Sequence, residues 1–216
     1  MDLLETLRSN GAVRGFTDEP VSDATIAAIL ETARFAPSGG NRQPWRVAVV
    51  KDEALRASLG ELMRPVWEEY CGANAAGQRP FAFGKSIDAP PVAAPNALID
   101  GIAHVPAVLA VAADLREIAI MDGNLERPPV VGGASIYPFC WSILLAARAH
   151  GLGGVLTTFL SRAEPAAAGP LGLPADHALV ATIFLGVPTH QNTRLRRNPV
   201  SSFAAIDRFD GVALAD

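Results

Sequence analysis

The sequence predicts one α/β-type domain with a small central sheet. Segments with apolar residues at helical spacing alternate with a few short apolar runs of strand length. Half of the 216 residues are hydrophobic and 19% are charged, which is enough apolar material for a sizeable core. We find no internal repeat and no linker-like stretch, so we predict a single domain over residues 1–216.

The composition argues against several classes of protein. A net charge of −4 is unlike that of a nucleic-acid-binding body, which needs a basic face. The two cysteines, Cys71 and Cys140, match no metal or redox spacing, and their small number favours a reducing compartment. The first residues carry charges rather than a signal sequence. We therefore expect a soluble, cytoplasmic protein without nucleic-acid or membrane partners.

One uncharged stretch, residues 128–147, is as long as a membrane span. Three prolines and two glycines occupy its first half and would break a membrane helix. We expect it to be part of a soluble fold.

The N-terminal half begins with two predicted helices. The first starts after Asp2, has an apolar face of leucines, and ends near Asn10-Gly11. An extended segment over 12–20 follows. Ser22 is the predicted N-cap of the second helix, in which Ile26, Ile29, Leu30 and Ala33 recur at helical spacing.

A buried strand is predicted at 47–50, and a third helix starts at Asp52 and is ended or kinked by Pro65. Residues 71–99 give no clear signal of order. A connection of this length is usually functional or mobile, so we expect either a lid beside a site or a disordered surface loop. The aromatic residues available to a lid are Trp67, Tyr70, Phe81 and Phe83.

The C-terminal half predicts a buried strand at 105–113, a polar loop at 114–127 and a helix at 136–150. That helix is apolar on nearly all sides, which is typical of a helix at a subunit interface. A glycine-rich stop at 151–154 precedes a strand at 155–158, a short helix near 162–169 and a strand at 178–187. The tail then becomes basic.

The loop at 34–46 joins the second helix to the first strand. Two prolines bracket Ser-Gly-Gly-Asn, so the ends of the loop are stiff while its middle lets backbone approach a ligand closely. Ser38, Asn41 and Gln43 supply uncharged donors and acceptors that suit a ligand with amide-like edges. A turn that only connects helix and strand would use the same residue types.

Few residues suggest familiar catalytic chemistry. The four histidines show no metal spacing, and none pairs obviously with a cysteine or carboxylate. The sequence contains no nucleophile elbow, phosphate-binding Walker loop or dinucleotide fingerprint. Arg14 and the late pair Arg196 and Arg197 could bind a phosphate, although the late pair alone also fits a solvated basic loop. A phosphorylated, flat heterocycle is therefore a reasonable ligand.

Two motifs resemble the FMN-dependent nitroreductase family. They are Ala-Val-Arg-Gly-Phe-Thr-Asp-Glu-Pro-Val at 12–21 and Ala-Pro-Ser-Gly-Gly-Asn-Arg-Gln-Pro-Trp-Arg at 36–46. Their separation, the Gly-Leu-Gly-Gly segment before a strand and the late Arg-Arg-x-Pro agree as well, so the resemblance covers nearly the whole chain.

The resemblance implies an α+β fold with a mostly antiparallel sheet flanked by helices. It also implies an intertwined homodimer, in which a C-terminal extension, here 188–216, reaches across the partner. Two FMN sites would lie at the interface, and residues 71–99 would form the variable rim. The residues that match the family's cofactor-binding positions are Arg14, Pro37, Ser38, Gly39, Asn41, Gln43, Leu156, Thr157, Thr158, Arg196 and Arg197.

The resemblance implies an oxidoreductase that passes hydride from NADH or NADPH through FMN to an electron-poor acceptor such as a nitroaromatic or quinone. The alternatives are reductive dehalogenation, flavin breakdown, non-catalytic flavin sequestration and a structural dimer without cofactor. The chain departs from the family at Asn10-Gly11-Ala12, where Arg-Arg-Ser or Arg-His-Ser is usual. One cation and one hydroxyl are missing, which predicts FMN binding roughly ten- to hundredfold weaker.

Overall fold

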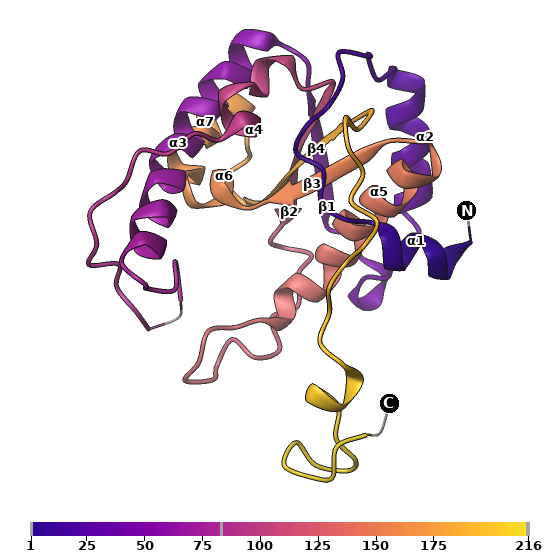
Figure 1. Cartoon of the computed structure of the whole chain (residues 1–216), viewed down its shortest axis with the longest axis vertical. Coiled ribbons are helices and arrows are strands. Elements are labelled where there is room, and N and C mark those ends of the chain that lie inside the picture. The colour runs from indigo at the N-terminus through magenta and orange to yellow at the C-terminus, as the bar shows by residue number, and fades with distance from the viewer. Residues whose placement is uncertain (1, 83, 215–216) are drawn as a thin grey trace.

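The strands of the computed structural model, which describes residues 2–82 and 84–214, form one antiparallel sheet (Figure 1). Phe83, an expected lid residue, lies outside the described residues. The spatial order of the strands is β1-β2-β4-β3. Their bounds are Trp45–Val50 (β1), Ala107–Asp114 (β2), Gly153–Thr157 (β3) and His177–Gly186 (β4). The prediction of an α+β fold with an antiparallel sheet is confirmed.

Strand β1 lies at the edge of the sheet and pairs only with β2 in the described part of the chain. The predicted strand at 47–50 is confirmed as part of β1, but its predicted burial is wrong, because only Val50 is buried and Ala48 is exposed. The apolar run reflects strand propensity, whereas burial depends on which strand becomes the edge.

Helices cover both faces of the sheet. One face packs on α2 (Asp23–Ala33) and α5 (Tyr137–Ala149), and the other on α3 (Glu53–Ala75), α4 (Ala97–Asp100), α6 (Phe159–Arg162) and α7 (Glu164–Leu171). Strand β2 is buried along its whole length, so Leu109 and Val111 face the first layer while Val108 and Ala110 face the second. The predicted N-cap is confirmed, since the Ser22 hydroxyl accepts from the Thr25 N–H at 3.1 Å.

Of the two predicted effects of Pro65, an end or a kink of the helix, the end is wrong, because helix α3 continues to Ala75. Proline costs a helix one backbone hydrogen bond, yet Met63 and Val66 are buried on either side of Pro65. This packing holds the helix together across the proline. The expected irregular segment therefore begins after 75 rather than at 71, and it ends at the short helix α4, where Leu98 and Ile99 are buried.

Apolar side chains of α5 and α1 remain exposed. Helix α5 buries one side, but Tyr137 and Trp141 on its other side are 45% and 41% exposed. The leucines of α1 (Leu3–Ser9), namely Leu3, Leu4 and Leu7, are exposed as well. No helix among residues 2–82 and 84–214 is long and apolar enough to cross a membrane.

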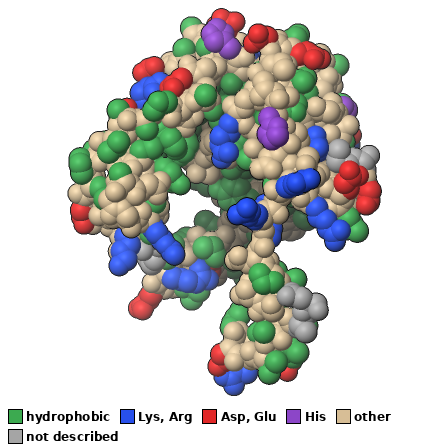
Figure 2. All heavy atoms as spheres, viewed as in Figure 1, with side chains coloured by type: hydrophobic (Ala, Val, Ile, Leu, Met, Phe, Trp, Pro, Cys, Tyr) green, Lys and Arg blue, Asp and Glu red, His purple; other side chains and the backbone are tan. Residues whose placement is uncertain are grey.

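The C-terminal segment has two parts. Its first part runs beside residues 15–17, where the Thr189 N–H donates to the Gly15 carbonyl at 3.1 Å and Phe16 bridges to Pro188. Residues 196–214, which we call the tail, project away from the body (Figure 1). Phe203 and Val212 in the tail are 72% and 76% exposed, and Figure 2 shows hydrophobic side chains on its surface.

Candidate active site

Arg14 lies on an extended segment that runs beside β3. The Val13 N–H donates to the Gly154 carbonyl at 2.9 Å and fixes this segment to the strand. The Arg14 side chain is exposed and has no hydrogen bond or ion pair with any described residue. An unpaired arginine beside a hollow is a candidate binding group for an anionic or electron-rich ligand.

Arg14 separates two hollows. The larger, which we call the aromatic recess, has a volume of about 570 Å³. This size is typical of small-molecule sites. It is lined by Arg14, Met63, Trp67, Tyr70, Pro95, Asn96, Leu98, Ile99, Leu156, Thr157, Thr158, Phe159 and Phe184. Four of the residues predicted to bind cofactor, Arg14 and the three at 156–158, therefore meet in one recess.

Aromatic rings form one wall of this recess. The Trp67 and Tyr70 rings stack with centroids 5.7 Å apart, and Phe159 meets both edge-on at 6.0 and 6.3 Å. Phe81 lies 6.4 Å from Tyr70 and carries the Arg162 guanidinium over its face at 4.5 Å. Such a wall suits a flat, uncharged ring.

Some polar side-chain groups of the residues that line this recess lack hydrogen-bond partners among the described residues of the protein. Thr157 Oγ1 is buried without a hydrogen-bond partner, and a buried hydroxyl in this state is costly unless a ligand or water satisfies it. Asn96 Oδ1 accepts from the Leu98 and Ile99 N–H groups as the N-cap of α4, which leaves its amide N–H₂ to donate elsewhere. Arg14 and the Asn96 amide are therefore candidate polar partners for a ligand in this recess.

The smaller hollow, of about 390 Å³, lies on the other side of Arg14. We call it the tyrosine recess. It is lined by Asn10, Ala12, Arg14, Tyr137, Trp141, Leu144, Gly154, Val155 and Leu156. The two hollows share Arg14 and Leu156, so a long ligand with a ring and a flexible chain could occupy both.

The predicted loop at 34–46 lies elsewhere in this chain. None of Pro37, Ser38, Gly39, Asn41 and Gln43 lines either recess. Ser38 Oγ accepts from the Gln43 N–H at 3.0 Å, and the Gly39 N–H donates to Ser135 Oγ at 3.1 Å. Asn41 and Gln43 have φ values of +54° and +50°, an uncommon conformation that is frequent at ligand-binding sites.

Arg196 and Arg197 are also absent from both linings. Both are exposed, and the Arg197 guanidinium donates to the Arg196 carbonyl at 2.7 Å. They follow Leu195, whose side chain packs against Gly11. The basic pair thus lies at the start of the tail, just after the part of the C-terminal segment that contacts residues 15–17.

Asn96 and Phe159 are lining residues that the sequence prediction missed. Asn96 lies in the segment without a clear pattern, although an asparagine directly before Ala97-Leu98-Ile99 fits an N-cap. Phe159 follows the predicted strand and carries no motif of its own. Of the aromatic residues considered for a lid, Trp67 and Tyr70 lie in α3, and the Phe81 ring lies beside Tyr70.

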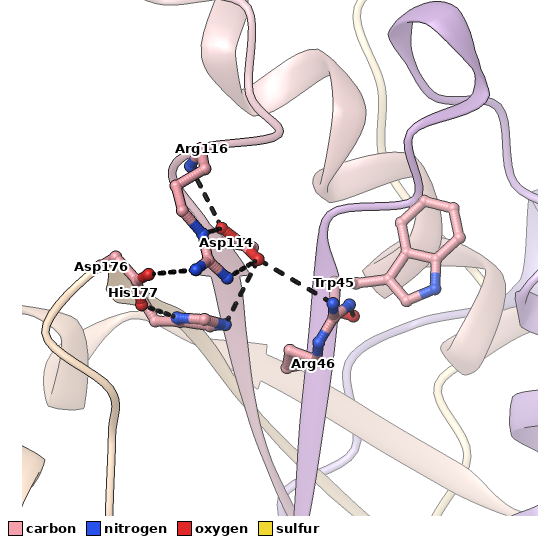
Figure 3. Close-up of polar contacts among 6 residues, drawn as sticks. All are labelled: Trp45, Arg46, Asp114, Arg116, Asp176 and His177. Atoms are coloured by element: carbon pink, nitrogen blue, oxygen red, sulfur yellow. Dashed lines mark hydrogen bonds and ion pairs between the residues drawn. The ribbon is translucent and has the colours of Figure 1, made fainter.

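The expectation that no histidine pairs with a carboxylate is wrong. His177 Nδ1 lies 2.8 Å from Asp176 Oδ1, and Asp114 lies beside both (Figure 3). Ligand atoms of the three residues lie within 4.8 Å of one another. Arg116 occupies the carboxylates of Asp114 and Asp176 with contacts of 2.6 Å, so the group is an ion-pair network. Asp114 is far from His177 in sequence and could not be paired with it from spacing, whereas Asp176 directly precedes His177.

An antiparallel sheet with helices on both faces defines an α+β fold, and the unpaired Arg14 beside two recesses marks a candidate ligand-binding site on it. The chain matches the Nitroreductase family over residues 8–187 and belongs to that family. The resemblance noted in the two sequence motifs is thereby confirmed.

Relatives and solved structures agree with this assignment. The chain is 30% identical over 203 residues to a NADH dehydrogenase of Thermus thermophilus, covering 88% of each chain. It is 31% identical over 186 residues to a 5,6-dimethylbenzimidazole synthase of Rhodospirillum rubrum, covering 83% of this chain and 79% of that protein. The fold matches the NADPH:FMN oxidoreductase of Vibrio harveyi with a TM-score of 0.69 at 19% identity, covering 97% and 78% of the two chains.

Proposed function

We propose that the protein is an FMN-dependent oxidoreductase that uses NADH or NADPH and reduces an electron-poor acceptor. Bound FMN would supply the redox chemistry by taking a hydride from the nicotinamide and passing it to a nitroaromatic, a quinone or a similar molecule. The observation that carries this proposal is the unpaired Arg14 beside a recess with an unsatisfied buried hydroxyl, Thr157 Oγ1.

Different residues of the chain would contact different parts of the bound cofactor and acceptor. Arg14 provides a positive charge beside the ring, which favours an electron-rich ligand. Leu156, Thr157 and Thr158 form the floor at the end of β3, and the Asn96 amide donates from α4. The aromatic wall of Trp67, Tyr70 and Phe159 excludes water and offers a surface on which a flat acceptor stacks.

The phosphate of the cofactor is assigned to the basic residues at the base of the tail. Arg196 and Arg197 are both exposed, and guanidinium groups bind phosphate bidentately. Their place after the residue that packs on Gly11 supports a phosphate beyond the tyrosine recess. A flavin chain running from the aromatic recess through the tyrosine recess would point in this direction.

We also propose that the functional unit is a homodimer in which each chain supplies the loop at 34–46 to the other chain's recess. Pro37, Ser38, Gly39, Asn41 and Gln43 line neither recess of their own chain. The exposed leucines of α1 and the exposed side of α5 give an apolar surface of the kind that subunits bury. The projecting tail, with its exposed Phe203 and Val212, would pack on the partner.

A second candidate is a flavin-binding protein with a different role, such as flavin breakdown, reductive dehalogenation or sequestration. The relative named for 5,6-dimethylbenzimidazole synthesis supports it, because that name describes the making of a heterocycle rather than the reduction of a nitro group. The rim at 76–96 would decide between these activities. We retain the cytoplasmic location and the single unit over 1–216 as proposals.

The visible spectrum of the purified protein, before and after anaerobic addition of NADH or NADPH, tests the main proposal. A yellow protein that bleaches and then recovers its colour with a quinone or nitroarene supports the oxidoreductase. A yellow protein indifferent to both nucleotides favours the second candidate. A colourless protein that binds no added FMN would refute flavin binding altogether. Light scattering coupled to gel filtration measures the subunit number independently.

A further inference from the structure

A further cavity, of about 410 Å³, opens on the α7 face of the sheet and shares no lining residue with the two recesses. It lies near the N-terminal end of β4, where His177 and Leu179 line it, whereas Phe184 of the same strand lines the aromatic recess. We call it the alanine cavity. Nothing in the proposed redox reaction uses it.

The cavity exists because small side chains meet the end of a helix. Ala48 of β1 and Ala110 and Ala112 of β2 form the floor, and their methyl groups leave space above the sheet. Helix α7 stops at Gly172, which has a left-handed φ of +60° and turns the chain away. Leu171 at the end of α7, followed by Leu173 and Pro174, then forms an apolar wall of the cavity.

The charged and titratable side chains that line the cavity are all basic. They are Arg46, Arg116 and His177, whereas Asp114 and Asp176 are not among the lining residues. The two carboxylates contact Arg116 and His177 (Figure 3). The His177 side chain is fixed in position, since it is only 7% exposed and its Nδ1 lies 2.8 Å from Asp176 Oδ1. Three basic side chains, Arg46, Arg116 and His177, therefore border a cavity that is otherwise mainly apolar.

Of the two arginines that line the cavity, Arg46 has the free hydrogen-bond donors that a ligand needs. Arg116 is engaged by Asp114 at 2.8 and 2.6 Å and by Asp176 at 2.6 Å. The Arg46 guanidinium donates only to the Trp45 carbonyl at 2.9 Å, and its nearest carboxylate oxygen, on Asp114, is 3.9 Å away. That distance is too long for a hydrogen bond, so most donors of Arg46 remain available.

We propose that the alanine cavity binds a small organic monocarboxylate with an apolar body. The carboxylate would take the free donors of Arg46, and the apolar body would lie on the alanine floor under Leu171 and Leu173. A monoanion fits better than a dianion, because Arg116 is already held by Asp114 and Asp176 and Arg46 is the one arginine of the lining without a carboxylate hydrogen bond. A metal ion fits poorly, since it would have to displace Arg116 from both carboxylates.

Calorimetric titration of the purified protein with cyclohexanecarboxylate tests this site. We expect one binding event per chain, and cyclohexanecarboxamide and acetate should each bind at least roughly tenfold more weakly because each lacks one half of the recognition. Arg46→Gln should weaken the carboxylate by roughly ten- to hundredfold. Arg8→Gln is the matched control, an exposed arginine on α1 outside the cavity, and should leave affinity unchanged.

Ala48→Leu provides a second, independent variant. It fills the floor without touching a charge, so it should weaken binding even if Arg46→Gln folds poorly. Circular dichroism checks both folds. An FMN titration in saturating cyclohexanecarboxylate separates this site from the proposed flavin site, and FMN affinity should not change.

Several results would overturn the proposal. They are no heat of binding at about 10 mM carboxylate, equal affinity in wild type and both cavity variants, or competition with FMN. A dimer structure with a partner's tail in the cavity would also exclude it. None of these depends on whether the protein turns over a nicotinamide, so this proposal and the oxidoreductase proposal fail separately.

Discussion

Gly11 lies directly against the backbone of Asn192: a Cβ atom at position 11 would be 2.4 Å from the Asn192 carbonyl oxygen. The Leu195 side chain closes the same space at 3.0 Å, and Gln191 Nε2 donates to the Gly11 carbonyl at 3.2 Å. This contact gives a physical reason why the chain has glycine where the family usually carries a cation. The C-terminal segment occupies the space that a longer side chain would need.

We therefore predict that Gly11→Ala destabilises the protein, because the extra methyl group must push a backbone carbonyl aside. Overpacking of this kind costs about 1–3 kcal/mol. The measurement is the free energy of unfolding from urea denaturation. Ala12→Ser is the control, because Ala12 is exposed and its added hydroxyl meets no such obstacle. Equal stability of Gly11→Ala and wild type would show that the C-terminal segment moves freely.

The second prediction concerns Arg14. Arg14→Gln should weaken FMN binding by roughly tenfold or more, since a charge-assisted hydrogen bond is lost while the side chain keeps a similar length. Because Arg14 has no partner among the described residues, its loss should leave the unfolding free energy nearly unchanged. Quenching of FMN fluorescence measures the affinity. If Arg14→Gln binds FMN as wild type does, the aromatic recess is not the flavin site.

The elements that sequence predicts best are those with a local signal. Ser22 and the spacing of Ile26 and Ile29 defined α2, whose N-cap and buried face are as expected. Local signals fail where tertiary contacts decide. Proline at 65 predicts that the helix ends or kinks, but burial on both sides of it lets α3 continue to Ala75. The edge position of β1 depends on strand order, which no local pattern encodes.

In the candidate site, too, the residues within sequence motifs were predictable, whereas those positioned by tertiary contacts were not. Arg14 and the segment at 156–158 were recognisable from motifs, and they line one recess. Asn96 was missed because its role depends on α4 folding back onto the sheet. The contact of His177 with Asp114 was missed because Asp114 belongs to another strand, and only the pairing of β2 with β4 places the two side by side. The contact with Asp176 is between adjacent residues, and the sequence itself offered that signal.

The third prediction concerns the rim at 76–96. Trp67 Nε1 donates to the Ala94 carbonyl at 2.9 Å and ties this segment to α3. Trp67→Phe keeps an aromatic ring in the wall but removes the hydrogen bond, whose net contribution is about 0.5–1.5 kcal/mol. We expect proteolysis within 76–96 to become severalfold faster, because local opening limits cleavage there.

Trp45→Phe is the matched control for this experiment. Trp45 stacks on Phe139 at 4.6 Å, away from the rim, so its replacement should not change the cleavage rate within 76–96. Mass spectrometry of the early fragments identifies the cleavage sites. Unchanged cleavage in Trp67→Phe would mean that other contacts, such as the Val92 N–H to the Glu68 carbonyl, hold the rim.

The last prediction is a dependence of stability on pH that originates at Asp114. The Arg116 guanidinium holds the pKa of this buried carboxyl well below its usual range, and His177 contributes in the same direction. In the unfolded chain the carboxyl returns to a pKa of about 3.9. The unfolded state therefore binds the proton first as the pH falls, and the stabilisation by Asp114 is complete above about pH 5 and decreases below about pH 4.

Asp114→Asn should be less stable at neutral pH and should lose less stability on acidification, as measured by urea midpoints from about pH 6 to about pH 3. Asp18→Asn, at an exposed position, should keep the wild-type profile. If Asp114→Asn loses stability below about pH 4 as steeply as wild type does, other carboxylates cause the acid sensitivity.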